Sequence, residues 1–457
     1  MLEVVRNFPR RTAARLSWAT GSFAVIQVIR MLNNVVLAHL LAPSLFGLML
    51  IVNSVRTGVE LISDVGINQN IVSNRLGHTR EFYDTAWTLR AARGIVLGTV
   101  CFSLAGVLAH FFEKPELNTI LRVIALTFVF GGFMSASPAL LQKKGSVARL
   151  SAFDITNAAL SLIVYVILAL ITPTIWALVL GAIVASAINL LISYLIVPGT
   201  RHNFAVDSRS AKEILHFGKW IFFSSLVYFF AMNFDRLYFA KQIALTELGI
   251  YSIARSLSDM VSNVVIRASN MVVFPTVAAM GVGGAELRGR LLLARRMLLL
   301  IVAVLLSCFV ALSDVVVRVL YDARYERASV FLPLLLISVW VSILSTVNDS
   351  LMLGTQRPSY PAMANLAKLL AFIVGVPVAF HFGGLPAAIL ILGVGETVRY
   401  VVLWSLARRI QLGFVRDDLA LTGVFLLLIV VIRQSLWAAG MTGSILSLFP
   451  LLRTIYL

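Results

Sequence analysis

Charged residues are scarce in this sequence. Asp, Glu, Lys and Arg together make up 13% of its 457 residues, whereas a soluble domain carries about 25%. Hydrophobic residues make up 59%, and the mean hydropathy is +0.92. A surface that faces water cannot be built from this composition, so a soluble enzyme is excluded.

The residue patterns of cofactor and metal sites are also missing. Cys101 and Cys308 lie inside apolar runs, and the six histidines are scattered without the spacing of metal ligands. The glycine-rich segment 281–285 lacks the Lys-Ser/Thr pair of a phosphate-binding loop, so no ATP site is expected. No Ser-His-Asp order can be assigned. The sequence therefore predicts no cofactor, no metal centre and no catalytic residues.

Apolar runs occupy most of the chain. A helix that spans a membrane needs about 20 apolar residues. Fourteen candidate runs lie at residues 16–41, 44–72, 82–112, 117–141, 147–172, 174–197, 214–240, 246–280, 291–320, 328–353, 359–382, 385–407, 418–437 and 441–457. The last is the least clear, because it contains Pro450 and Arg453. We predict an all-α polytopic membrane protein with about fourteen transmembrane helices and no extramembrane domain.

The net charge of +17 is unevenly distributed among the connections. In a soluble protein such a charge would indicate nucleic acid. Here basic clusters such as Lys143–Lys144 and Arg408–Arg409 follow even-numbered spans, whereas connections after odd-numbered spans hold few basic residues. Cytoplasmic loops carry the excess of Lys and Arg in membrane proteins. The pattern predicts a cytoplasmic location for both termini and no nucleic-acid partner.

The chain also contains an internal duplication. Residues 37–51 align with residues 239–253 at an offset of 202, so that Phe46-Gly47 meets Leu248-Gly249. An even number of spans separates the copies, which gives both halves the same orientation in the membrane. The predicted domains are a six-helix bundle at 1–197, a cytoplasmic linker at 198–213, a second bundle at 214–410 and additional helices at 411–457.

Polar residues recur at helical spacing inside three predicted spans. A charge at the bilayer centre costs at least about 2.5–3.5 kcal/mol, so such stripes must face protein or water. They comprise Gln27, Arg30 and Asn34 in the first span, Arg56, Glu60 and Asp64 in the second, and Arg255, Asp259, Asn263 and Arg267 in the eighth. Acidic neighbours one turn away can neutralise Arg56 and Arg255, so a structural role stays open for both. Arg30 has no such neighbour, which favours a functional role.

The other charged residues give weaker signals. Arg90 and Arg93 lie near the cytoplasmic end of the third span, where their side chains are expected to reach the interface. Asp314 and Arg318 are spaced for an ion pair along one helix. Asp235-Arg236 lies near the outer end of the seventh span. The pattern sets no depth for Asp154, Asp349, Lys368, Glu396 and Arg399.

Four phrases point to a known family: LLAPSLFGLMLIVNSV, ISDVGINQNIV, EFYDTAWTLRAARG and NFDRLYFAKQIALTELGIYSIARSL. In their order along a duplicated chain, they resemble the polysaccharide transporter family of Wzx-type flippases, which shares a superfamily with MATE exporters and the lipid II flippase. The likeness extends over residues 10–410. It implies two six-helix bundles around a central cavity, two additional C-terminal helices, alternating access and the inner membrane of a bacterial cell.

The resemblance also implies a substrate and partners. The expected substrate is a polyprenyl-diphosphate-linked oligosaccharide, the precursor of O-antigen, capsule or exopolysaccharide. Membrane lipids and polysaccharide polymerase or export proteins are the expected partners. Lipid II flippases place cavity arginines on the corresponding helices, which assigns Arg30, Arg56 and Arg255 to the diphosphate. Gln27 and Asn34 would contact the substrate beside them, and Arg267 would serve initial capture.

Coupling and competing functions stay open at this stage. Glu60, Asp64, Asp259 and Asp235 are the candidate groups for coupling to protons or sodium ions. A membrane glycosyltransferase or polymerase acting on the same lipid is one alternative, but the largest connection faces the cytoplasm, and such enzymes need a large outer loop. A MATE-like cation exporter is another, but its cavity should be acidic, whereas arginines occupy these stripes.

Overall fold

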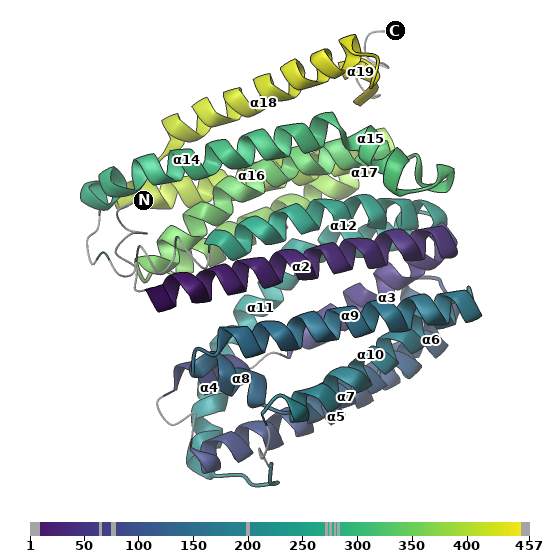
Figure 1. Cartoon of the computed structure of the whole chain (residues 1–457), viewed down its shortest axis with the longest axis vertical. Helices are drawn as coiled ribbons and strands as arrows, with labels where there is room; N and C mark the ends of the chain where they lie inside the picture. The colour runs from purple at the N-terminus through teal and green to yellow at the C-terminus, as the bar shows by residue number, and fades with distance from the viewer. Residues whose placement is uncertain are drawn as a thin grey trace. The chain divides into compact units, whose positions relative to one another are not determined.

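Helices account for every regular element in the described part of this computed structural model (Figure 1). The structure describes residues 10–63, 66–74, 79–197, 202–269 and 284–448, together with residues 273, 277 and 280. Within these ranges, ten helices are long and apolar enough to cross a membrane. The prediction of an all-α polytopic membrane protein is confirmed.

The chain divides into two compact units. The N-terminal unit comprises residues 2–229 and 236–249, and the C-terminal unit comprises residues 230–235 and 250–457. The first helices of the N-terminal unit are α2 (Arg10–Leu40), α3 (Pro43–Ile62), α4 (Ile67–Ser73), α5 (Arg80–Phe111), α6 (Glu116–Ile124), α7 (Leu126–Phe133), α8 (Ser137–Lys143), α9 (Val147–Ile171) and α10 (Ile175–Leu195). Helix α2 packs on α9, and α5 packs along α6 and α7, which α10 also contacts.

The predicted span 117–141 is interrupted in the structure. Helices α6 and α7 follow one another at Ala125, but the chain leaves helical geometry at Met134 before α8 begins at Ser137. Pro138 lies in the first turn of α8, the position in a helix that tolerates a residue without a backbone N–H. The non-helical residues 134–136 therefore lie between two apolar helices.

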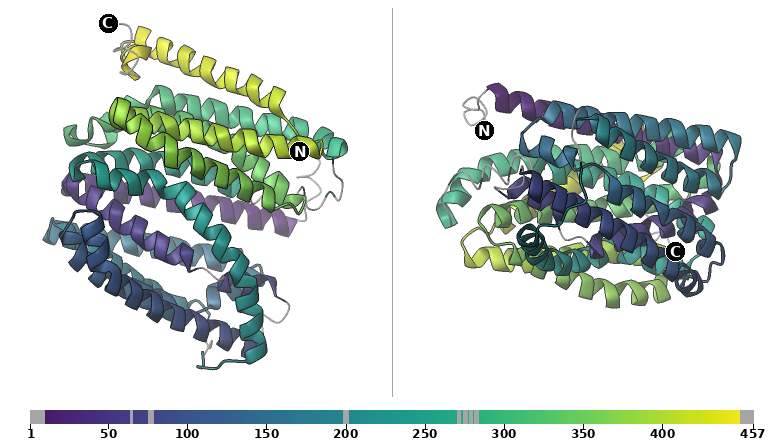
Figure 2. Two further views of the ribbon diagram at one scale, coloured as in Figure 1. Left: turned by 180° about the vertical axis from the view of Figure 1, so that it is seen from behind. Right: turned by 90° about the horizontal axis from the view of Figure 1, so that it is seen from below.

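The remaining helices begin with α11, which passes from the N-terminal unit into the C-terminal unit. They are α11 (Ser208–Gln242), α12 (Leu245–Ala268), α14 (Gly284–Ala311), α15 (Ser313–Leu320), η2 (Ala323–Tyr325), α16 (Ala328–Gly354), α17 (Ser359–Arg409), α18 (Val415–Ala438) and α19 (Ile445–Leu448). Within the C-terminal unit, α16 packs against α17 and α14 packs against α18 (Figures 1 and 2). A buried apolar cluster that includes Leu287, Leu351 and Leu403 joins α14, α16 and α17.

Helix α17 contains two predicted spans, 359–382 and 385–407. Its 51 residues are too many for one crossing, and Gly384 has a non-helical backbone conformation with φ 64° and ψ −157°. A residue with a Cβ atom adopts this region only at a cost, so glycine permits the change of direction. The boundary between the two predicted spans coincides with this kink.

Helix ends and predicted spans do not always coincide. Helix α14 begins at Gly284, before the predicted span 291–320, and α11 begins at Ser208, before the predicted span 214–240, so each helix extends beyond its predicted span. Of the predicted last span, residues 449–457 lie outside the described residues, and α19 has only four residues. The number of fourteen spans stays a prediction.

Two ion pairs attach α18 to α14 at one end. Arg295 pairs with Asp418 in the protein interior, with a second hydrogen bond of 3.0 Å from Nη2 to Oδ2. The neighbouring Arg296 pairs with Asp417, although the Arg296 side chain is half exposed. Two neighbouring side chains also contact this buried pair. Arg295 Nη2 donates to Asn348 Oδ1 at 3.2 Å, and the Tyr400 hydroxyl donates to Asp418 Oδ2 at 2.5 Å.

The sequence repeat corresponds to a direct contact between α3 and α12. A Cβ atom added to Gly47 would lie 3.0 Å from the backbone nitrogen of Gly249, and one added to Gly249 would lie 3.1 Å from the nitrogen of Gly47. Each would also overlap a backbone carbonyl of the other helix, at Leu245 or Pro43. Glycine at both aligned positions therefore allows the two helix starts to touch.

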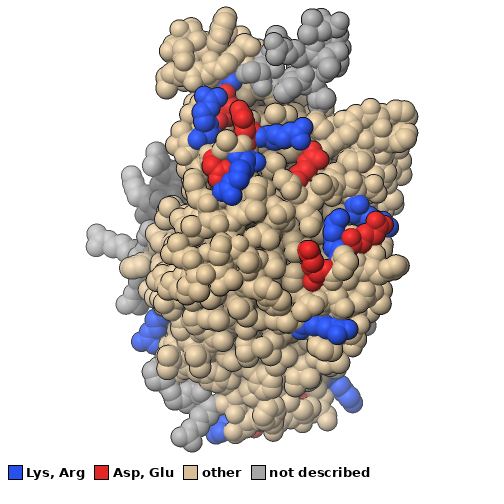
Figure 3. All heavy atoms as spheres, turned by 90° about the vertical axis from the view of Figure 1, so that its right-hand side faces the viewer, with Lys and Arg blue, Asp and Glu red and all other residues tan. Residues whose placement is uncertain are grey.

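Uncharged side chains cover most of the atoms in Figure 3, where charged residues form small groups. Leucine, isoleucine and valine side chains on the long helices are well exposed, among them Leu170 and Leu195 at 65% and 73%. Hydrocarbon lipid is the solvent in which such surfaces are stable, and helices satisfy their own backbone hydrogen bonds there. The exposed apolar surface thus agrees with a membrane location.

Candidate functional site

A cavity of about 450 Å³ lies inside the N-terminal unit. Its walls come from α3, α4, α5, α7 and α10, and it falls in the size range of small-ligand sites. The polar side chains that line it are Arg56, Glu60, Asn68, Gln69, Arg90, Arg93, Thr127, Ser186 and Asn189. Among the described residues, three arginines therefore share one cavity with a single carboxylate.

Arg56 and Glu60 occupy successive turns of α3 and form a loose ion pair. The distance from Arg56 Nε to Glu60 Oε1 is 3.9 Å, and the two side chains are 33% and 53% exposed. Arg56 Nε is itself buried and has no hydrogen-bond partner. An exposed pair at this distance contributes little free energy, so Glu60 leaves most of the hydrogen-bonding capacity of Arg56 available.

Arg93 anchors α5 to the end of α3. Its Nη2 donates to the backbone carbonyl of Glu60 at 2.6 Å and to Ser63 Oγ at 2.9 Å. The last carbonyls of a helix lack partners within the helix and carry partial negative charge. This contact orients the guanidinium of Arg93 at the cavity wall.

Arg90 lies one turn earlier on α5 and faces α7. Its Nε donates to the carbonyl of Gly131 at 3.1 Å, and its Nη2 lies 3.7 Å from Met134 Sδ. No carboxylate in the described residues forms an ion pair with it. Arg90 and Arg93 are like charges three positions apart on one helix face, an arrangement that is repulsive unless an anion lies between them.

Two glycines bring α5 and α7 close enough for these contacts. A Cβ atom on Gly94 would lie 2.6 Å from Gly132 Cα, and one on Gly132 would lie 3.0 Å from the carbonyl oxygen of Arg90. The helices therefore meet backbone to backbone beside the cavity. This close approach lets Arg90 reach the carbonyl of Gly131.

The sequence analysis did not include Arg90 and Arg93 among the candidate site residues. The structure places both with Arg56 at the cavity, and their expected reach to the membrane interface stays a prediction. The i, i+3 spacing on α5 was the available signal, because it puts both guanidinium groups on one helix face. Whether that face meets lipid or protein depends on the packing of α7, which spacing does not specify.

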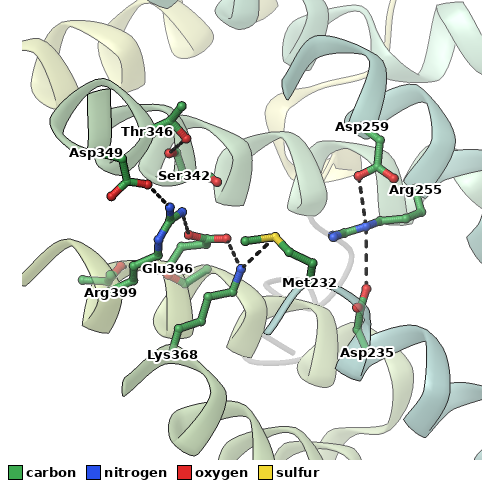
Figure 4. Close-up of polar contacts among 12 residues, drawn as sticks. Met232, Asp235, Arg255, Asp259, Ser342, Thr346, Asp349, Lys368, Glu396 and Arg399 are labelled. Atoms are coloured by element: carbon green, nitrogen blue, oxygen red, sulfur yellow. Dashed lines mark hydrogen bonds and ion pairs between the residues drawn. The ribbon is translucent and has the colours of Figure 1, made fainter. Parts of the chain in front are cut away.

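In the C-terminal unit, Arg255 lies between two carboxylates (Figure 4). Its Nε is 3.7 Å from Asp235 Oδ2 on α11 and 3.3 Å from Asp259 Oδ1 on α12. Tyr251 also donates a hydrogen bond to Asp235. The structure thus brings together three predicted site residues, and it adds Asp235 to the pairing of Arg255 with Asp259 that the sequence had left open.

A second charged network in the C-terminal unit crosses α16 and both arms of α17 (Figure 4). Lys368 Nζ lies 2.6 Å from Glu396 Oε1, Arg399 lies 3.3 Å from Glu396 Oε2, and Arg399 also pairs with Asp349. Lys368 is 2% exposed and Arg399 is 4% exposed. Two cations and two anions balance here, which is how buried charges are tolerated. The sequence pattern had set no depth for these residues.

The other predicted residues are more scattered. Arg30 is exposed on α2, and Asn34 is half-buried one turn along. Gln27 is 8% exposed, and its amide nitrogen and oxygen have no hydrogen-bond partner. Arg267 is exposed near the end of α12. Asp64 lies outside the described residues.

The expected pairing of Asp314 with Arg318 was wrong. Asp314 instead accepts two hydrogen bonds of 2.8 Å from Arg433 on α18, and Arg433 is fully buried. Spacing along one helix predicted the local partner, but packing of α18 supplies a bidentate partner from a distant segment. Bidentate Arg–carboxylate contacts are stronger than single ones.

Several known proteins are similar in sequence to this chain. TuaB of Bacillus subtilis (strain 168), a teichuronic acid biosynthesis protein, is 22% identical over 355 residues, which are 77% of this chain and 73% of TuaB. WzxC of Escherichia coli (strain K12), a lipopolysaccharide biosynthesis protein, is 21% identical over 82% of this chain and 76% of its own length. ExoT of Rhizobium meliloti (strain 1021), a succinoglycan biosynthesis transport protein, is 22% identical over 70% and 63%.

Solved structures share the fold at lower sequence identity. The lipid II flippase MurJ in an inward closed conformation superposes with a TM-score of 0.75 at 11% identity, over 91% of this chain and 92% of MurJ. An inward-facing multidrug resistance MATE family transporter of the MOP superfamily gives 0.68 at 12% identity, over 90% and 98%. The family described as polysaccharide biosynthesis protein matches residues 36–330. This chain belongs to that family, in agreement with the resemblance found in its sequence.

Proposed function

We propose that this protein flips a polyprenyl-diphosphate-linked oligosaccharide across the cytoplasmic membrane by alternating access. Membership of the polysaccharide biosynthesis protein family and the likeness to flippase and exporter folds support a transporter. The observation that carries the substrate assignment is the arginine cavity of the N-terminal unit. The lipid tail can stay in the bilayer, while the diphosphate and the sugars need a polar, cationic site.

The cavity suits a diphosphate because of the groups that line it. In the described part of its lining, the cavity has three guanidinium groups, those of Arg56, Arg90 and Arg93, and one carboxylate, that of Glu60. Arginine stays charged at any physiological pH, and its planar fork binds phosphate oxygens through two hydrogen bonds at once. Arg90 forms no ion pair with a carboxylate of the described residues, and the phosphate would supply it with an anionic partner.

The residues assigned from the resemblance complete the proposed path. Arg30, exposed on α2 with Gln27 and Asn34 nearby on the same helix, would meet the headgroup, and Arg267 would serve initial capture. Arg255 is held by Asp235 and Asp259, so its guanidinium would be released to the substrate when one of these carboxylates takes up a proton. Glu60 and Asp64 are the corresponding coupling candidates on the α3 side.

The topology and partners belong to the same proposal. Both termini would lie in the cytoplasm of a bacterial cell, and the protein would reside in the inner membrane. The bundles at 1–197 and 214–410, joined by the linker 198–213, would alternate in access, with 411–457 as additional helices. Polysaccharide polymerase and export proteins would receive the flipped lipid.

A cation exporter fits the fold but not the cavity. The shared architecture with a MATE transporter would allow such a function. Three arginines in one cavity, however, repel a cationic substrate by direct Coulomb interaction. The polymerase alternative lacks a candidate catalytic centre among the described residues.

The decisive experiment measures flipping in proteoliposomes. A polyprenyl diphosphate that carries a fluorescent sugar is incorporated, and its label is exposed to a membrane-impermeant reductant over time. Arg90→Gln should slow flipping about ten- to a hundredfold, because a hydrogen bond to a charged group contributes about 1.5–3 kcal/mol. Arg90→Lys should rescue only partly, because the fork is lost.

Arg122→Gln is the matched control, since Arg122 is an exposed arginine on α6 that stacks over Phe102 and does not line the cavity. It should flip the lipid at the wild-type rate. Equal rates for Arg90→Gln and Arg122→Gln would contradict the placement of the diphosphate in this cavity. Absence of flipping by the wild-type protein would contradict the function itself.

A further inference from the structure

The segment between α10 and α11 is held in an aromatic box. The His202 ring stacks on Trp87 with a centroid distance of 5.1 Å and an interplanar angle of 10°. Tyr83 stacks on it at 5.0 Å, and Tyr194 meets it edge-on at 5.3 Å. Phe204, two residues later, contacts Trp87 at 4.9 Å. Side chains of α5 and α10 thus enclose a histidine of the connecting segment.

The backbone of residues 202–207, the strap, binds one face of α5 at alternate positions. The amide of Asn203 donates to Asp84 at 3.3 Å, that of Ala205 to Thr88 at 3.1 Å and that of Asp207 to Thr85 at 2.9 Å. Asp207 then caps α11 by accepting from the Ser210 amide at 2.8 Å. The strap therefore fixes the base of the helix that passes from one unit to the other.

The strap also holds the wall of the arginine cavity. His202 Nε2 lies 2.9 Å from Ser135 Oγ, and the amide of Ser135 donates to Ser193 at 2.9 Å. Residues 131, 132 and 134 line the cavity, whereas Phe133 and Ser135 face the box, with Phe133 at 6.1 Å from Trp87. A single short segment is thus shared by the cavity and the box.

The box accepts a neutral imidazole better than a charged one. His202 Nδ1 is buried and has no hydrogen-bond partner, so a second ring proton would be a donor without an acceptor. The faces of the aromatic rings and the carboxylate of Asp84 both favour a charged imidazolium over a neutral ring. Burial nevertheless lowers the pKa of His202 below its usual value, with Asp84 opposing and the Arg90 charge reinforcing that shift.

The groups that face His202 from each packed element are few. Helix α5 contributes Tyr83, Asp84 and Arg90, α10 contributes Tyr194, and the wall segment contributes Ser135. Asp84 is shared with Arg80 at 3.7 Å, which weakens its hold on an imidazolium. His202 is thus the group in this set whose ordinary pKa lies near neutrality.

We propose that the strap is a proton-operated latch: neutral His202 seats it in the box and steadies the cavity wall, and protonation of His202 releases it. The direction of the pH effect follows from the difference in proton uptake between the released and the seated strap. The released strap binds a proton with the ordinary pKa of about 6.5, whereas the seated ring resists protonation. Seating is therefore complete above about pH 6.5 and is lost as the pH falls below that value. The latch is independent of which substrate the cavity holds.

Backbone hydrogen exchange of the strap tests this directly on the purified full-length protein. Exchange times are scaled to the intrinsic rate, and the peptide covering residues 203–208 is compared at pH 7.5 and pH 5.5. Wild-type protection should fall by up to about tenfold at the lower pH, which is the limit for a released ring with a pKa of about 6.5 and a seated ring that takes up no proton. His202→Phe keeps an aromatic ring without a titrating group, so its protection should be the same at both values.

Thr88→Ala is the matched control, because it removes the acceptor of the Ala205 amide and leaves His202 in place. Its protection should be lower at both pH values and should still fall with acid. Equal wild-type protection at both pH values would overturn the latch, as would an acid-induced loss in His202→Phe as large as in wild type. If His202→Phe does not fold, His202→Gln gives the same comparison.

Discussion

Gly47 and Gly249 touch across the start of α3 and α12, 202 positions apart in a chain whose halves align at that same offset. Neither backbone leaves space for a side chain at this point. The predicted topology puts both helix starts at the outer side of the membrane. The repeat therefore brings a glycine from each copy to one contact inside the N-terminal unit.

We expect Gly47→Ala to destabilise the folded protein. The added methyl group would meet the backbone of α12, which cannot move aside as a flexible side chain can. Overpacking of this kind typically costs about 1–3 kcal/mol. Gly423→Ala on α18, where nothing lies within 4 Å, is the control and should leave the protein as stable or slightly more so. The measurement is the thermal unfolding temperature of each variant in the same detergent. Equal temperatures for Gly47→Ala and Gly423→Ala would show that the contact at Gly47 is not tight.

Adjacent arginines on α14 should respond very differently to substitution. Arg295→Leu leaves Asp418 buried and unpaired, which costs about 3–5 kcal/mol. Arg296→Leu breaks a pair whose arginine is half exposed although its Asp417 is 10% exposed, so the loss should be smaller than that of Arg295→Leu. Denaturation of the two variants checks the ranking. Similar losses would mean that burial does not set the strength of these pairs.

Coupling should depend on the carboxylates around Arg255. Asp259→Asn removes the closer proton-accepting partner, so flipping should no longer respond to an imposed pH gradient. Glu116→Gln, at the exposed start of α6, is the control and should keep the wild-type response. The readout is the ratio of flipping rates with and without the gradient. A wild-type protein that flips equally after proton and sodium gradients are collapsed would remove the coupling role altogether.

Reporter fusions test the predicted topology. A reporter after Gly145, in the connection between α8 and α9, should be active on the cytoplasmic side. One after Pro115, between α5 and α6, should be active on the outer side. Activity of both reporters on the same side would contradict the alternation of basic residues on which the orientation rests.

The sequence determined the spans better than the site, and particular residues show why. Apolar runs predicted helices because length and hydropathy are local properties, and even the kink at Gly384 fell at a predicted boundary. Asp314 was paired with Arg318 because spacing reveals only neighbours on one helix, whereas its partner Arg433 is 119 positions away. Arg90 was not among the predicted site residues for the same reason, since periodicity does not show which helix packs over it.

The box around His202 shows a second limit. Tyr83 and Trp87 are one turn apart on α5, which is visible in the sequence, but Tyr194 and His202 join them only through the packing of α10 and the path of the strap. A lone histidine in a polar connection therefore carried no signal. Its neighbours come from three separate segments.

The ion pairs that α18 makes with α14 and α15 have a consequence for biosynthesis. The partner of Arg295 lies 123 positions later in the chain, and the partner of Asp314 lies 119 positions later. During synthesis α14 and α15 must therefore enter the membrane before their counter-charges exist. The nascent chain passes through a stage with uncompensated charges that only the arrival of α18 resolves. A chain that stops before residue 415 would therefore lack the partners of both Arg295 and Asp314.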